Sequence, residues 1–262
     1  MPSDKSSITL TILGSGTCVP SLKRSSCSVL MEIGQSKLLF DSGPGTIRRL
    51  LEAGTTIFEI SHIFYSHFHL DHSGEFVPIL FSTKYPDGRQ RKTPLTVTAA
   101  RGFGHFYAKL KDVYGHWMEL APGLLIIKEL DNRGRDALQF EDFSIESAPV
   151  VHNEESIAYR ITGPDGQAVV YSGDTDFSEN LIDLAGSANL LICECATPDD
   201  LKIKGHLTPS LAGEIASRAN VGQLVLTHFY PDCDRTDIKK QCRKTYDGPL
   251  ILAQDLMQIN ID

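Results

Sequence analysis

Long apolar runs are missing from this 262-residue chain. No segment approaches the ~18 apolar residues that a membrane-spanning helix needs, so we expect no membrane span. The stretch from Met1 to Ser7 is polar and lacks the apolar core of a secretory signal. We therefore expect a cytoplasmic protein.

Closely spaced cysteine pairs are missing as well. The chain has six cysteines, and no two of them form the CxxC pattern found in many zinc and redox sites. An even number of cysteines carries little weight in a chain this long. A reducing compartment is the simpler interpretation.

The chain also lacks an excess of positive charge. Its formal net charge is −8 at pH 7, whereas dedicated nucleic-acid binders are usually basic. Bound divalent ions would change the field locally, so the net charge alone does not exclude a nucleic-acid partner.

Internal repeats, low-complexity segments and linkers are absent from the sequence. The glycine-rich stretch over residues 14–17 lacks the GK[ST] ending of a phosphate-binding loop, so it predicts a tight turn or a loop at the mouth of a site. The length permits a sizeable core. We expect a single domain over residues 1–262, built as an α/β fold of two packed sheets with helices outside.

The feature that stands out is the run HFHLDH over residues 67–72, in which four of six side chains can bind a metal ion. The largely apolar residues 61–66 precede it and predict a buried strand. A helical pattern over residues 74–83 follows. A strand and a helix would hold the ligand loop rigidly on both sides.

The remaining pattern is strand-rich in both halves and then alternates between helix and strand. This similarity of the halves favours one domain over two. We predict further strands over residues 8–13, 27–33, 37–40, 95–99, 124–130, 143–151, 156–161, 168–172, 189–195 and 223–227, and further helices over 46–53, 101–114, 177–185, 209–219 and the basic stretch 235–244.

Histidines gather at the predicted strand ends and loops. Six of the nine have neighbours such as Gly, Asp or Pro at chain turns, which core packing does not explain: His67, His69, His72, His152, His206 and His228. His105 and His116 have no acidic or histidine neighbour at ligand spacing, so we predict structural or surface roles for them.

The pattern fits two metal ions. His67 and His69 are two residues apart and project to the same side of an extended backbone, so they can share one ion. Asp71 and His72 follow where the chain turns, which suits a second ion. His152 and His228 can complete the two sets, and Asp174 can bridge them as a carboxylate.

Nitrogen and oxygen ligands suit Zn²⁺ best, with Mn²⁺ or Fe²⁺ also possible. Two ions ~3.5–4 Å apart hydrolyse phosphoesters through a bridging hydroxide, without a serine or cysteine nucleophile. Asp41 lies at a strand end before a glycine turn. It is either a turn-former or a carboxylate that orients a metal-bound histidine.

These residues resemble the metallo-β-lactamase superfamily and, within it, the ribonuclease Z-like branch. The resemblance spans nearly the whole chain. It is carried by LGSGTCVP over residues 13–20 with Arg24 and Ser28, LFDSGPGT over 39–46, HFHLDH over 67–72, His152, Asp174, ECAT over 194–197, GHLT over 205–208 and THF over 227–229.

The resemblance implies a four-layer αβ/βα sandwich with the metal ions at the edge between the sheets. It assigns to the first ion His67, His69, His152 and Asp174, and to the second ion Asp71, His72, His228 and the shared Asp174. It also implies that Asp71 acts on the attacking water. His206, oriented by Glu194, would stabilise the phosphate or protonate the leaving oxygen, because a carboxylate fixes the tautomer of an imidazole and raises its pKa. Cys193 and Cys195 beside Glu194 are interpreted as buried strand residues.

One departure from the branch concerns the substrate. Transfer-RNA-processing members carry a long flexible arm, in one common subgroup between the third and fourth motifs. Here His152 to Asp174 spans 174 − 152 = 22 positions, filled by a plain hairpin. We therefore expect a small or cyclic phosphodiester substrate rather than transfer RNA. A homodimer is expected from the resemblance alone.

The sequence leaves several further functions open. Within the enzymes, they are a ribonuclease Z-type endonuclease acting on the 3′ side of transfer RNA, and a hydrolase of a non-phosphate ester, thioester or lactam. Outside that class, they are a non-enzymatic binding module and a di-iron redox protein.

Overall fold

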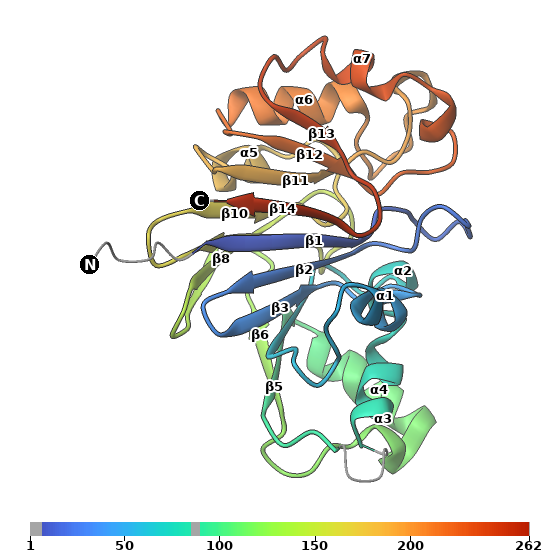
Figure 1. Ribbon diagram of the computed structural model, residues 1–262, viewed down its shortest axis with the longest axis vertical. Coiled ribbons are helices and arrows are strands. Elements are labelled where there is room, and N and C mark those ends of the chain that lie inside the picture. Colours follow the sequence, from blue (N-terminus) through green and yellow to red (C-terminus); the bar gives the residue numbers. More distant parts are fainter. Residues whose placement is uncertain (1–6, 85–89, 262) are drawn as a thin grey trace.

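The computed structural model describes residues 7–84 and 90–261. Two seven-stranded sheets pack against each other, and helices cover their outer faces (Figure 1). This arrangement confirms the predicted four-layer α/β sandwich. The expectation that residues 1–262 form one domain stays a prediction.

The first sheet joins the start of the chain to its end. Its order is β14 (Met257–Ile261), β1 (Ile8–Gly14), β2 (Ser28–Ile33), β3 (Ser36–Phe40), β4 (His62–Tyr65), β5 (Leu95–Ala100) and β6 (Leu125–Leu130). The pairs from β14 to β3 are antiparallel, and those from β3 to β6 are parallel.

The second sheet repeats this division into an antiparallel and a parallel part. Its order is β13 (Leu250–Leu252), β12 (Leu224–Thr227), β11 (Leu190–Glu194), β10 (Ala168–Tyr171), β9 (Ile157–Thr162), β8 (Ser144–Pro149) and β7 (Asp136–Gln139). The pairs from β7 to β10 are antiparallel and those from β10 to β13 are parallel.

The helices divide between the two sheets. Those of the first half are α1 (Thr46–Glu52), α2 (Leu70–Ser73), α3 (Phe76–Lys84), α4 (Phe103–Tyr114) and the 3₁₀ turn η1 (Gly115–Met118). Those of the second half are α5 (Glu179–Leu184), α6 (Pro209–Arg218), α7 (Ile238–Cys242) and the 3₁₀ turns η2 (Asp199–Leu201) and η3 (Cys233–Arg235). Within the described residues, no helix combines the length and apolarity needed to cross a membrane.

The alternation of side chains along the strands produces two cores. In β2, Val29 and Met31 pack between the sheets, whereas Leu30 points to the other face and packs with the helices of the first half. The period of two places successive side chains on opposite faces of a sheet. A central sheet strand is therefore buried on both faces, as the continuous apolar runs predicted.

The predicted helices and strands agree with the structure within a few residues at their ends. The sequence patterns did not predict β7, β13, β14 and the single-turn helix α2. These elements are only three to five residues long, which is too short for a periodic pattern to stand out.

Candidate metal centre

The predicted site residues lie at one edge of the sandwich. Asp41 follows β3, His67 follows β4, Asp174 follows β10 and His228 follows β12. These strands belong to the parallel parts of the two sheets, so their carboxyl ends meet on the same side, where ligand sites of α/β folds usually form. Glu194 is the last residue of β11 and joins the same edge.

The backbone at this edge is strained. Asp41 and His228 have φ angles of 57° and 58°, values that non-glycine residues rarely adopt. Gly173 has the same conformation, and a Cβ there would lie 2.4 Å from the Cβ of Ser66. Such strain persists where surrounding contacts hold it, and it is common at functional sites.

A first group of side chains combines His67, His69, His152 and Asp174. His69 Nδ1 lies 3.1 Å from His67 Nε2 and 3.2 Å from His152 Nε2. The Oδ2 atom of Asp174 lies 3.7 and 3.9 Å from the same Nε2 atoms. The structure thus brings together the four residues predicted for the first ion.

A second group combines Asp71, His72 and His228. The two histidine Nε2 atoms are 3.3 Å apart, and Asp71 Oδ2 lies 3.6 Å from that of His228. Asp174 faces this group with its other oxygen: Oδ1 lies 3.1 Å from His72 Nε2 and 3.3 Å from His228 Nε2. Asp174 therefore presents one carboxylate oxygen to each group.

This arrangement fits divalent metal ions. Asp174 Oδ1 is buried and has no hydrogen-bond partner within the described part of the chain, and an unsatisfied buried polar atom is costly. Imidazole nitrogens that converge at 3.1 to 3.3 Å repel one another unless a proton or a cation satisfies their lone pairs. Histidine nitrogens and carboxylate oxygens are suitable ligands for such cations.

Burial and charge set the protonation of the groups. Burial lowers the pKa of His67 well below its ordinary value, so this ring is neutral, as a metal ligand must be. Burial opposes the charge of Asp174 too, but His228 and His72 outweigh it and lower its pKa. Burial also opposes the charge of His72, but Asp174 and Asp41 raise its pKa well above the ordinary value.

Asp41 contacts His72 of the second group. Its Oδ2 atom lies 2.7 Å from His72 Nδ1, on the side of the ring opposite to Asp174. Of the two interpretations of Asp41, the structure therefore favours the carboxylate that orients a histidine of the site. The residue also ends β3 in a turn, so the two roles are combined.

The predicted pairing of His206 with Glu194 is present. His206 Nδ1 lies 3.0 Å from Glu194 Oε1, which also accepts a hydrogen bond from the Thr175 backbone. Glu194 Oε2 accepts one from the Leu207 backbone. Burial lowers the pKa of His206, but the hydrogen bond to Glu194 and the charges of Glu194 and Asp174 together outweigh burial and raise that pKa. With Nδ1 engaged by Glu194, only Nε2 of His206 can act on a substrate.

The residues predicted to lie outside the site do so. Cys193 and Cys195 are fully buried, and neither belongs to a candidate ligand group among the described residues. All six cysteines have free thiols. His105 and His116 are exposed on α4 and η1.

Some residues of the site escaped the sequence analysis. Ser66 bonds to Asp41, Tyr171 reaches Asp41 from the other sheet, and Asn153 Nδ2 lies 3.1 Å from His69 Nε2. Ser66 and Asn153 could have been suspected because they adjoin His67 and His152 in sequence. Tyr171 gave no such signal, since it follows three apolar residues in a buried strand.

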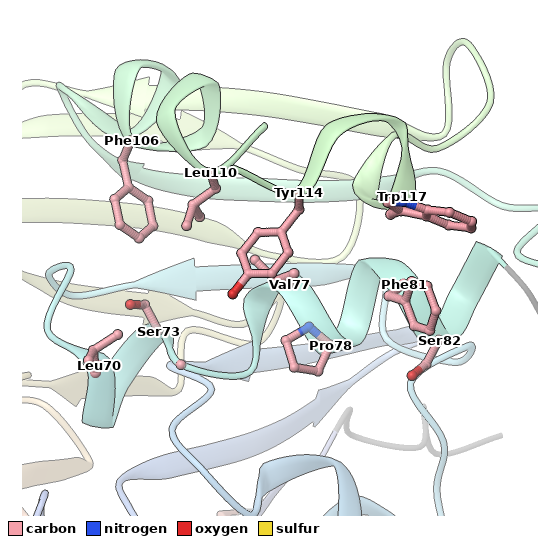
Figure 2. A pocket seen from close by; sticks show the side chains of 11 residues that line it. Leu70, Ser73, Val77, Pro78, Phe81, Ser82, Phe106, Leu110, Tyr114 and Trp117 are labelled. Carbon is pink, nitrogen blue, oxygen red and sulfur yellow. The ribbon is translucent and has the colours of Figure 1, made fainter. Parts of the chain in front are cut away.

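Two cavities adjoin helix α2, which carries Asp71 and His72. One, of about 480 Å³, is lined by Asp71 and by residues of the β1–β2 connection, including Cys18 and Arg24. The other, of about 700 Å³, lies between α3 and α4 (Figure 2). No charged side chain lines the larger cavity, and Leu70 borders both. The smaller cavity is therefore the one that offers a substrate access to Asp71.

Comparison with known proteins agrees with this geometry. The family model described as the beta-lactamase superfamily domain matches residues 36–229. The chain therefore belongs to this family, the metallo-β-lactamase superfamily. Its relatives place it in the ribonuclease Z-like branch, as the resemblance implied.

A ribonuclease Z from Methanothermobacter thermautotrophicus is 26% identical over 96% of both chains. Among solved structures, the metallo-beta-lactamase fold protein YhfI from Bacillus subtilis has a TM-score of 0.83 at 22% identity and covers 98% of this chain and 100% of its own. The short form of human tRNase Z has a TM-score of 0.76 at 22% identity and covers 96% of this chain and 98% of its own. These two structures support the fold.

Proposed function

We propose that this protein is a dinuclear metal-dependent phosphodiesterase. The observation that carries the proposal is Asp174, whose two oxygens face two separate groups of histidine and aspartate side chains. His67, His69 and His152 would hold one ion with Asp174. Asp71, His72 and His228 would hold the other with the same carboxylate. Zn²⁺ is the preferred ion, with Mn²⁺ or Fe²⁺ as substitutes.

When bound, two such ions lower the pKa of a water molecule and neutralise charge on a phosphoryl group. Asp71 borders the 480 Å³ cavity, and its side chain is 12% exposed. Burial opposes the charge of Asp71, but the hydrogen bond to His228 and the charges of His72 and His228 together lower its pKa, so it can orient the attacking water as a carboxylate.

His206 supplies the proton in this proposal. Its side chain is 12% exposed, and Glu194 holds its Nδ1. The raised pKa keeps the ring protonated to a higher pH than usual. His206 can therefore donate from Nε2 to the leaving oxygen, and a proton donor of this kind contributes roughly 10²–10⁴-fold to the rate.

A small or cyclic phosphodiester is our preferred substrate. Only the β9–β10 hairpin separates the neighbourhoods of His152 and Asp174. The alignment with the Methanothermobacter ribonuclease Z is 303 positions long, so at least 303 − 262 = 41 positions have no counterpart in this chain. The net charge of −8 also disfavours a polyanionic RNA.

Transfer RNA is the second candidate. The relatives favour it over a small substrate, because the ribonuclease Z match extends over 96% of both chains. The preference for a small substrate is therefore not confirmed by the comparisons. The two candidates share the metal centre and differ only in what binds around it.

A direct competition decides between them. Metal-replete protein is offered bis(p-nitrophenyl) phosphate, a panel of cyclic nucleotides and precursor transfer RNA at physiological salt. We expect turnover of a small phosphodiester and little cleavage of the RNA. Efficient RNA cleavage would contradict the substrate preference. Failure to hydrolyse any phosphodiester would contradict the proposed function.

Functions without phosphodiester hydrolysis differ from this proposal in measurable ways. The substrate of an ester, thioester or lactam hydrolase has no phosphate group for His206 to stabilise. The turnover of such an enzyme would therefore survive His206→Ala. A binding module would hold its ions without turnover, and a di-iron redox protein would show an iron-dependent potential. A cytoplasmic location and a homodimer remain parts of the proposal.

A further inference from the structure

Hydrogen bonds connect Asp41 to both metal-ligand groups. His72 of the second group has its Nδ1 atom 2.7 Å from Asp41 Oδ2. His67 of the first group has its Nδ1 atom 3.0 Å from Ser66 Oγ, which lies 2.8 Å from the same Asp41 oxygen. One histidine thus contacts the carboxylate directly, and the other contacts it through a serine hydroxyl.

The direction of these hydrogen bonds follows from the donors present. A carboxylate only accepts, so the Ser66 hydroxyl donates to Asp41, and its oxygen is then free to accept from His67. Nδ1 of both His67 and His72 then carries hydrogen. In the neutral form of both rings, Nε2 keeps its lone pair, and this atom faces Asp174.

The position of Asp41 depends on the opposite sheet. The hydroxyl of Tyr171, in β10, donates to Asp41 Oδ2 over 2.7 Å, and Asp41 Oδ1 accepts from the Ser66 backbone over 2.8 Å. Asp41, Ser66, His67, His72 and Tyr171 are all at most 2% exposed. Both oxygens of the Asp41 carboxylate are therefore bonded in the orientation in which Oδ2 meets His72 Nδ1 and Ser66 Oγ.

We propose that Asp41 couples the two metal sites, with Ser66 as its link to the first and Tyr171 as the residue that positions it. This inference rests on the proposed dinuclear centre. An ion at either group requires an Nδ1-protonated histidine, and that ring orders Asp41 in the orientation that the other group also needs. By linkage, each ion then raises the affinity of the other by the same factor. Ser66 and Tyr171 touch no ion themselves and act as positioning residues.

The hydrogen bonds that connect the two ligand groups to Asp41 can be removed separately. Ser66→Ala removes the link to His67 and leaves the bonds from His72 and Tyr171 to Asp41 in place. Tyr171→Phe removes the positioning hydroxyl common to both groups. Tyr159→Phe is the matched control, because Tyr159 is also fully buried and packs on Phe40, but its hydroxyl donates to the backbone carbonyls of Tyr65 and Thr98.

The test is a zinc titration of the metal-free full chain by calorimetry. We expect wild type to take up two ions in one steep transition. Ser66→Ala should separate it into a near-wild-type step and a step about tenfold weaker, a typical loss for a residue behind a ligand. Tyr171→Phe should weaken both ions together, and Tyr159→Phe should leave the curve unchanged.

Nuclear magnetic resonance of the zinc-loaded protein assigns the weakened site. Wild type should show slowly exchanging Nδ1 protons on both His67 and His72. Ser66→Ala should lose the first signal and keep the second. The proposal is overturned if Ser66→Ala keeps a single steep transition, or if Tyr159→Phe weakens binding as much as Tyr171→Phe. Wild type that binds no zinc would overturn the proposed function as well, whereas two independent ions would overturn only the coupling.

Discussion

The two ends of strand β4 place histidines in opposite environments. At the start of the strand, the His62 ring lies 4.8 Å from that of Phe140 and 5.4 Å from that of Phe143. Burial lowers its pKa to about 4. Just beyond the other end, His67 lies among Ser66, Asp174 and further histidines.

The difference comes from what the rest of the chain brings to each end. At the start of β4, the antiparallel hairpin β7–β8 supplies aromatic rings, and a neutral histidine is accepted as a flat, mostly apolar side chain. At the other end, the parallel strands of both sheets end together and supply carboxylates. The identity of a residue therefore does not determine its role; the strand ends that converge on it do.

The largest effect is expected at the carboxylate end. Asp174→Ala removes the carboxylate that both ligand groups share and should lower phosphodiesterase activity by at least about a thousandfold, because metal ions contribute several kcal/mol to such reactions. Zinc content by mass spectrometry should fall in parallel. Asp200→Asn, at an exposed position in η2, is the control. Full zinc content and activity in Asp174→Ala would break the comparison.

A smaller loss is expected from the proton donor. His206→Ala should lower kcat by about 10²–10⁴-fold while zinc content stays at the wild-type level. Glu194→Gln should lower the pKa of His206, so the activity that depends on protonated His206 should disappear at a lower pH than in wild type. The measurement is kcat against pH. An unchanged profile in Glu194→Gln would separate His206 from the chemistry.

The aromatic end should affect stability and not activity. Unfolded, His62 takes up a proton near pH 6.5, but the folded protein resists this until about pH 4. The folded state should therefore lose stability as pH falls from 6.5 to 4. The loss should be about 1–2 kcal/mol, because the partial exposure of His62 to solvent reduces the effect. Urea unfolding of wild type and His62→Phe should show a flatter pH dependence in the variant. Equal slopes would mean that His62 is not responsible.

The 700 Å³ cavity should also matter little for activity. Leu110 lines it and is half-buried, so Leu110→Ala should cost about 1–2 kcal/mol of stability. Turnover of bis(p-nitrophenyl) phosphate should stay within about twofold of wild type. A large loss of turnover at unchanged zinc content would show that this cavity takes part in substrate binding. The two ends of β4 would then not account for all of the functional surface.

Much of the architecture follows from local sequence patterns. The HFHLDH run, the glycine turns and the apolar strands predicted where His67, His72 and Asp174 would stand, because strands that are buried on both faces give long apolar runs. Strand β14 could not be predicted in this way, because its pairing partner β1 lies at the other end of the chain. Long-range pairing leaves no periodic signal in a five-residue segment.

The support of the site was harder to predict than its ligands. Asp41 was found because it precedes a glycine turn, but Tyr171 looks like any buried aromatic residue. Its hydroxyl meets Asp41 only because the two sheets stack. Sequence spacing shows which residues share a loop. Only the packing of the two sheets determines which hydroxyl group lies next to Asp41.

Trp117 is the only tryptophan of the chain, and it lines the cavity between α3 and α4 (Figure 2). The residue is 49% exposed, so its emission responds to whatever enters or leaves that space. The molecule therefore carries its own optical probe on the apolar side of α2. Tryptophan fluorescence during a zinc titration, or on dilution of the protein, needs no added label. It would show whether zinc binding or dilution changes the surroundings of Trp117.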